Sequence, residues 1–122
     1  MIVRILAVTV LALGLIASAG AQTKGPNGGI VMKADDHLVK FVQRGQEIVF
    51  YLGGPDGKPL STKGLQALAL VQDGGKITNI TLAPTEPNSF VGKLAAPVGT
   101  KARIVFSTRI DGQTLQARFV TD

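Results

Sequence analysis

Residues Lys101–Val120 read KARIVFSTRI DGQTLQARFV and form two similar halves joined at Asp111-Gly112. Strict alternation of apolar and polar residues buries one face of a β-strand. An Asp-Gly pair between two such runs is a strong signal for a two-residue hairpin turn. The stretch therefore predicts two antiparallel strands that bury a common face. The alternating apolar residues are Ala102, Ile104 and Phe106 in the first half, and Leu115, Ala117 and Phe119 in the second.

The same organisation extends over residues 30–122. Short apolar stretches recur there with turn residues about 8–12 positions apart, which is typical of an all-β sandwich or barrel. Leu65–Val71 is rich in Ala and Leu, but its flanking glycines and short length favour a strand over a helix. We expect seven or eight antiparallel strands in two sheets and almost no helix. The expected strands are Ile30–Lys33, His37–Gln43, Glu47–Leu52, Leu65–Gln72, Lys76–Leu82, Ser89–Ala95, Lys101–Thr108 and Gln113–Val120.

Residues 1–21 are predicted to be a helical signal peptide that is removed on export. The apolar run Ile5–Ala17 precedes Ala19-Gly20-Ala21, which has small residues at the two positions that signal peptidase accommodates. Cleavage there leaves Gln22 first, and Ala17-Ser18-Ala19 offers a second possible site. An uncleaved anchor is the alternative, but the run is shorter than the roughly 20 residues of a spanning helix. The leader is typical of export to the bacterial periplasm, with no stable membrane span after cleavage.

The mature chain divides into a flexible lead-in and one domain. Residues 22–29 are polar and glycine-rich, without an apolar pattern, and residues 30–122 are long enough for a single β-domain. The chain has no cysteine. Its stability therefore rests on apolar burial and hydrogen bonds, and thiolate catalysis, thiolate metal sites and disulfide exchange are excluded.

No residue pattern indicates catalysis. The acidic residues are scattered, mostly in turns, so no pair of general acid and base is indicated. Gly53–Lys58 is glycine-rich and ends in lysine, but it lacks the spacing and the following helix of a phosphate-binding loop. We expect a protein that is not an enzyme and has no resident cofactor. The serines of the mature chain lack the Gly-x-Ser-x-Gly setting of a nucleophile; they are Ser61, Ser89 and Ser107.

One short segment gathers potential metal ligands. Met32, Asp35, Asp36 and His37 offer a thioether, two carboxylates and the only imidazole of the chain. A copper or zinc site usually takes three or four converging ligands, so these residues predict at best a weakly bound divalent metal. The favoured interpretation is structural: Asp35-Asp36 makes a tight turn, and His37 begins a strand and shares a face with Val39 and Phe41.

The positive charge predicts no nucleic-acid partner. The chain carries 13 Lys and Arg against 8 Asp and Glu, a formal charge of +5, which becomes +4 without Arg4 of the leader. We expect Lys101, Arg103, Gln116 and Arg118 to share an outward sheet face. Nucleic-acid readers pair such a face with exposed aromatic residues, but here the phenylalanines are needed in the core. A solvated face is favoured, and weak attraction to an acidic partner or to anionic lipid is the alternative.

Five motifs follow one another along the mature chain: Gly25–Gly29, Asp36-His37, Asp56–Leu60, Asp73–Lys76 and Gln116–Phe119. In this order they resemble a family of small exported bacterial β-domains. Members occur alone or at the N-terminal side of periplasmic membrane fusion proteins of heavy-metal efflux systems of the cobalt-zinc-cadmium type. The resemblance implies an immunoglobulin-like β-sandwich without catalytic activity and with an accessory role in metal export. Members often carry His-His-x-Glu or His-x-x-Glu where this chain has His37-Leu38-Val39-Lys40, so a lysine replaces the acid and a second histidine is absent.

These observations predict an exported, monomeric or weakly associating binding or accessory module of the periplasm. Its partner would be an envelope or efflux-system protein. Two alternatives stay open. One is a weak metal-binding protein that uses His37 with Asp35, Asp36 or Met32. The other is a structural subunit that joins an envelope complex through an edge strand.

Overall fold

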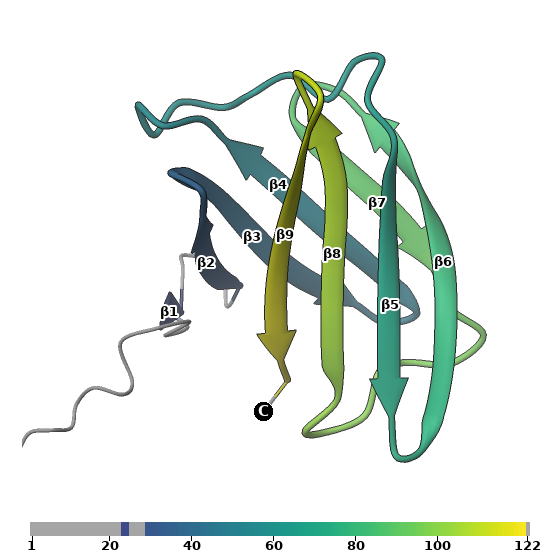
Figure 1. The fold of residues 1–122 in the computed structure, drawn as a ribbon. Coiled ribbons are helices and arrows are strands. Elements are labelled where there is room, and N and C mark those ends of the chain that lie inside the picture. The colour runs from purple at the N-terminus through teal and green to yellow at the C-terminus, as the bar shows by residue number, and fades with distance from the viewer. Residues whose placement is uncertain (1–22, 25–28, 122) are drawn as a thin grey trace, which may run out of the picture.

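Figure 1 shows the computed structural model, which describes residues 23–24 and 29–121. All regular secondary structure in these residues is β-strand, and they include no helix long and apolar enough to cross a membrane. The predicted signal peptide and most of the lead-in lie outside the described residues, although Thr23–Lys24 of the lead-in form a strand. The strands are β1 (Thr23–Lys24), β2 (Ile30–Ala34), β3 (His37–Arg44), β4 (Glu47–Gly53), β5 (Ala67–Asp73), β6 (Lys76–Thr85), β7 (Ser89–Lys93), β8 (Arg103–Ile110) and β9 (Gln113–Val120).

The eight strands expected from the sequence are confirmed, each within three residues at either end. Their arrangement corrects the prediction of two sheets. All pairs are antiparallel, and the strands form one nearly closed sheet in the order β1-β2-β3-β4-β7-β6-β5-β8-β9. This single sheet differs from the immunoglobulin-like β-sandwich that the sequence led us to expect.

Strand β6 is the reason that the sheet is continuous. Its residues Lys76–Leu82 pair with β5, and its last residues, Ala83–Thr85, pair with β7. The sequence led us to expect that this strand ends at Leu82, two residues before Pro84. However, β5 ends its pairing with β6 at Leu82, so Pro84 has a neighbouring strand on one side only, where a missing N–H is tolerated. The strand therefore continues and connects the two halves of the sheet (Figure 1). One half is β1-β2-β3-β4-β7, and the other is β6-β5-β8-β9.

The sheet curves so that β2, the neighbour of the end strand β1, approaches the other end strand, β9. These strands are in contact, but no backbone ladder joins them in the described part of the chain. A small pocket of about 260 Å³ lies between them and is lined by Met32–Asp35 and Gln116–Arg118. The sheet is therefore nearly, but not fully, closed.

The core lies between the two halves of the sheet and is centred on phenylalanine. All five phenylalanines of the chain are buried and connected through ring contacts, with centroids 4.8 to 5.9 Å apart. Because they come from strands of both halves, their packing holds the halves together. They are Phe41 of β3, Phe50 of β4, Phe90 of β7, Phe106 of β8 and Phe119 of β9.

The hairpin turn predicted at Asp111-Gly112 is confirmed, and the structure shows a second one between β5 and β6. Asp111 and Gly112 separate β8 from β9 and both have positive φ, 52° and 80°. Gly74 and Gly75 do the same between β5 and β6, with φ of 62° and 103°. Positive φ at both central residues defines the type I′ turn, whose twist matches that of the flanking strands. These turns place β8 beside β9 and β5 beside β6, which sets the surface described below.

Candidate functional site

The four predicted metal ligands are divided between the core and the surface. Met32 is buried, and it belongs to the apolar core cluster. His37 begins β3, as predicted, and pairs with Ala34 of β2. It lies on the same side of β3 as the buried Val39 and Phe41, at the end of the strand, and is half-buried. Asp35 and Asp36 form the exposed turn between β2 and β3. The thioether and the carboxylates therefore lie in different surroundings.

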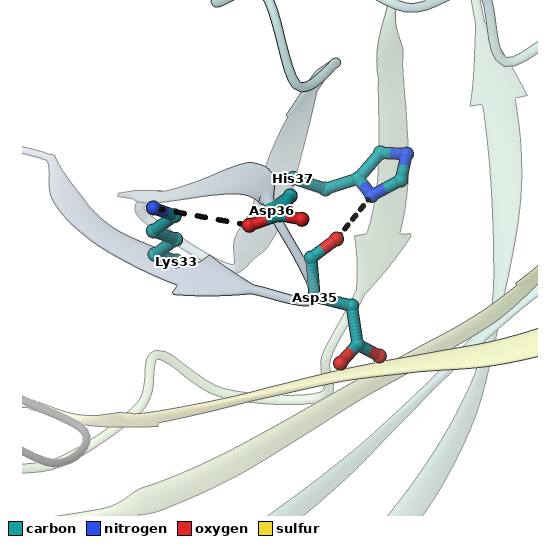
Figure 2. A network of polar contacts seen from close by, with 4 residues as sticks. All are labelled: Lys33, Asp35, Asp36 and His37. Carbon is teal, nitrogen blue, oxygen red and sulfur yellow. Dashed lines mark hydrogen bonds and ion pairs between the residues drawn. The ribbon is translucent and has the colours of Figure 1, made fainter.

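The polar side chains of this turn diverge rather than converge (Figure 2). Asp36 points toward Lys33, with 4.0 Å between its Oδ1 and the lysine Nζ. His37 Nδ1 lies 3.0 Å from the main-chain carbonyl oxygen of Asp35. A carbonyl only accepts, so Nδ1 carries the proton. The Asp35 carboxylate points away from the ring (Figure 2). Within residues 23–24 and 29–121, no three His, Cys, Asp or Glu side chains are grouped to hold a metal.

The Asp35-Asp36 turn yields a prediction about stability. Both residues have positive φ, 45° and 68°, and glycine is the residue preferred at the second position of this turn. We expect Asp36→Gly to raise Tm by about 2–4 °C. Glycine relieves the backbone strain that a residue with a Cβ has at positive φ, and this gain slightly exceeds the additional conformational entropy that glycine loses on folding. The loss of the Lys33 pair should cost little because both side chains are largely exposed. Thermal unfolding followed by circular dichroism measures the change.

The matched control for this prediction reverses the exchange in the other Asp-containing turn. Gly112→Asp converts Asp111-Gly112 into Asp-Asp, in a turn where Gly112 has a φ of 80°. It should lower Tm by a similar amount. A fall in Tm for both variants would contradict the account of the turn.

A second candidate site is the outward face of β6, β5, β8 and β9, which we call the arginine face. The ladder registers align its side chains in rows across the four strands. Figure 1 shows β5, β8 and β9 in front of β3, β4 and β7. The arginine face is the side of the sheet opposite to the buried residues of these strands, such as Ala69, Phe106 and Phe119. Its residues are Ile77, Asn79 and Thr81 of β6; Leu68, Leu70 and Gln72 of β5; Arg103, Val105, Ser107 and Arg109 of β8; and Thr114, Gln116, Arg118 and Val120 of β9.

Apolar exposure and the absence of any acidic residue set the arginine face apart. It carries three arginines and no acidic residue. The described residues have four large hydrophobic side chains that are exposed, and three of them lie here: Leu68 at 55%, Ile77 at 61% and Val120 at 41%. The outward face of the opposite half is also cationic, but it includes an acidic residue, Glu47, beside Lys93 and Arg44. Clustered apolar exposure beside positive charge with no acidic neighbour is typical of a binding surface.

The leucines of this face result from an inverted alternation in β5. Ala67 and Ala69 point inward and are 2% and 1% exposed, whereas Leu68 and Leu70 point outward. The inward positions are small because phenylalanine fills the core; Phe106 pairs with Ala69 in the neighbouring strand. The sequence predicted this strand, but one signal in it was not used. Its leucines alternate with alanines, so the larger residues lie on the face opposite to Ala67 and Ala69.

The predicted basic surface is partly confirmed. Arg103, Gln116 and Arg118 share the arginine face, as the alternation in β8 and β9 predicted. Lys101 lies before β8 begins, with a φ of 59°, and is not one of its ladder positions. Arg109 belongs to the face and was not singled out from the sequence, although it follows Arg103 at an even spacing in the same strand.

A groove of about 830 Å³ opens at one end of the arginine face. Leu68, Ser107 and Arg109 of the face line it, together with Leu65 and the neighbouring residues of the segment before β5. Among the described residues that line the groove, Arg109 is the only charged one. The arginine face thus combines a flat region of sheet with a recess in which a side chain of a partner could be bound.

Comparisons with protein-family models, curated proteins and solved structures give no match to this chain.

Proposed function

We propose that the chain is an exported, non-catalytic binding module of the bacterial periplasm that is accessory to an envelope assembly. The arginine face carries this proposal. It lacks acidic residues and gathers three arginines with most of the exposed large hydrophobic side chains of the described residues. A partner of the opposite character, acidic and partly apolar, would complement it.

The location of this function rests on sequence features. The leader supports export, and the resemblance to small β-domains of heavy-metal efflux systems supports an efflux-system protein as the partner. We propose that the domain acts as a monomer in this role. Direct metal binding receives no support from the arrangement of Met32, Asp35, Asp36 and His37, because Met32 is in the core and the other side chains diverge.

Site-specific cross-linking tests the proposed function. Because the chain has no cysteine, a single Gln116→Cys substitution places one photo-cross-linker on the exposed arginine face. Lys93→Cys is the matched control, because Lys93 is also exposed but lies on β7 of the opposite half. We expect Gln116→Cys, and not Lys93→Cys, to give one discrete cross-linked product in envelope fractions of the native bacterium, which mass spectrometry identifies as an efflux-system or other envelope protein.

Charge reversal makes this test specific. Arg103→Glu combined with Arg118→Glu should abolish the product, whereas Arg44→Glu on β3 should leave it unchanged. Arg44 is exposed and donates a hydrogen bond to the Tyr51 hydroxyl at 3.0 Å, so it is a comparable surface arginine away from the face. Equal cross-linking from both cysteine positions, or none from either, would contradict the proposed function.

A further inference from the structure

We propose that the groove and the arginine face together bind an extended acidic peptide segment whose carboxylates are spaced to match the three arginines. This inference rests on the proposed function and names the chemistry of the partner. The groove provides a recess for one aliphatic side chain, and the arginines provide the sites for the carboxylates that flank it.

The groove wall is held in place by hydrogen bonds to buried threonines. Thr108 is 2% exposed, and its hydroxyl donates to the Gln66 carbonyl oxygen at 2.6 Å. Thr62 is fully buried, its hydroxyl donates to the Thr85 carbonyl oxygen at 3.3 Å, and its own carbonyl accepts from the Leu65 amide at 3.0 Å. These bonds anchor the segment before β5 to both β8 and β6. The groove is therefore preformed, which lowers the entropic cost of binding.

The arginines are available for an external partner. Arg109 donates from Nη2 to the Gly112 carbonyl oxygen at 2.9 Å. This bond holds the guanidinium at the β8–β9 turn, and because the carbonyl is neutral the bond does not neutralise the positive charge. In the described part of the chain, no carboxylate forms an ion pair with Arg103, Arg109 or Arg118. All three are exposed.

The register sets the spacing of the carboxylates. Arg109 and Arg103 are six residues apart along β8, about 20 Å at the rise of a strand. Between them, Ser107 is the partner of Leu68, and Val105 is the partner of Arg118. An extended peptide along β8 directs every second side chain toward the sheet. Positions 1, 5 and 7 of such a peptide face Arg109, Arg118 and Arg103, while position 3 faces Leu68.

This geometry favours a peptide over a membrane surface. A bilayer contacts the protruding side chains of a protein, whereas the groove beside Leu65 and Leu68 is a recess that the side chain of an extended peptide can enter. The predicted ligand therefore carries an acid, an aliphatic residue, an acid and an acid at alternate positions.

A nuclear magnetic resonance titration of the 15N-labelled mature chain tests this inference. The probe is the synthetic peptide acetyl-Glu-Ser-Leu-Ser-Glu-Ser-Glu-amide. We expect saturable shifts of the Leu68, Ser107, Arg109 and Arg118 amides. A peptide of the same composition with its three acids adjacent, and a peptide with lysine in place of glutamate, should give no saturable shift.

Variants of the protein make the assignment specific. Arg109→Gln should raise the dissociation constant about threefold, the size expected for one exposed ion pair, and Leu68→Ser should raise it by a similar factor. Both side chains are exposed, so both variants should fold. The control Arg44→Gln, on β3, should not change the dissociation constant. Equal binding of the adjacent-acid peptide, or an equal effect of Arg44→Gln, would overturn the inference.

Three further outcomes distinguish failure of this inference from failure of the proposed function. If phosphatidylglycerol vesicles shift the same amides and the peptide does not, the peptide inference is overturned and the face binds a lipid surface. If the peptide fails but the Gln116→Cys cross-link forms and is lost on charge reversal, the peptide inference is overturned and the binding function stands. If both fail, both are overturned.

Discussion

Replacing Phe50 with alanine is expected to leave the domain largely unfolded at room temperature or to lower its Tm by more than about 15 °C. Phe50 is fully buried. Its ring stacks on Phe106 of the opposite half at 4.8 Å and also contacts Phe41 and Phe119 at 5.3 and 5.9 Å. Removal of a buried phenylalanine costs about 3–5 kcal/mol. A domain of this size has a total stability of about 5–15 kcal/mol, so one side chain accounts for a large share of it.

The neighbouring residue provides the control for this prediction. Tyr51 follows Phe50 in β4 but faces outward and is only half-buried. Tyr51→Ala removes the Arg44 hydrogen bond and the contact with Lys40 Nζ, 5.7 Å from the ring centroid. These surface contacts are worth about 1 kcal/mol, so the fall in Tm should be about 4–8 °C. Thermal unfolding followed by circular dichroism compares the two variants, and equal falls would disprove a phenylalanine-centred core.

Gly92→Val is expected to destabilise the domain by about 1–3 kcal/mol, the usual cost of overpacking a core. Gly92 is buried in β7 and pairs with Ile48. A Cβ atom at this position would lie 2.6 Å from Leu82 Cδ2 and 3.0 Å from Ile80 Cγ2. Glycine is required here because the side chains of β6 already occupy the space. Chemical unfolding in urea, analysed by linear extrapolation, measures the change.

Two further variants isolate the steric cause of the Gly92 effect. Lys93→Val adds the same side chain at the next position, where Lys93 is exposed, and strand propensity predicts no destabilisation. Leu82→Ala removes the nearest atom, so its combination with Gly92→Val should be less destabilising than the sum of the two single variants. Additive effects would contradict the predicted contact.

The strands were predictable because their signals are local. Asp111-Gly112 and Gly74-Gly75 each specify a two-residue turn, and alternation on both sides specifies which residues are buried. The error at the end of β6 has a tertiary cause. Pro84 is tolerated because β5 stops pairing at Leu82, and the sequence around Pro84 carries no sign of where β5 ends.

The candidate site was predictable only in part. Arg103 and Arg118 belong to one hairpin, so alternation alone placed them on the same face. Leu68 and Ile77 joined them only through the pairing of β5 with β8, which brings Leu68 beside Ser107 although 39 residues separate them in the chain. No local signal specifies a pairing at that separation. The alternative of a metal site grouped Met32, Asp35, Asp36 and His37 by their proximity along the chain. The structure divides these side chains between the core and the surface, because adjacent residues of a strand and its turn point in different directions.

The sequence by itself therefore determined the strands, their buried residues and the hairpins, because alternation and positive-φ turns act over a few residues. The tertiary structure decided that the strands form one nearly closed sheet instead of two. It also decided that the face of β5, β6, β8 and β9 is both arginine-rich and apolar. Both outcomes depend on pairings between segments far apart in the chain, β4 with β7 and β5 with β8. Burial of the phenylalanine cluster, contributed by both halves of the sheet, is the physical reason that these distant strands are brought together.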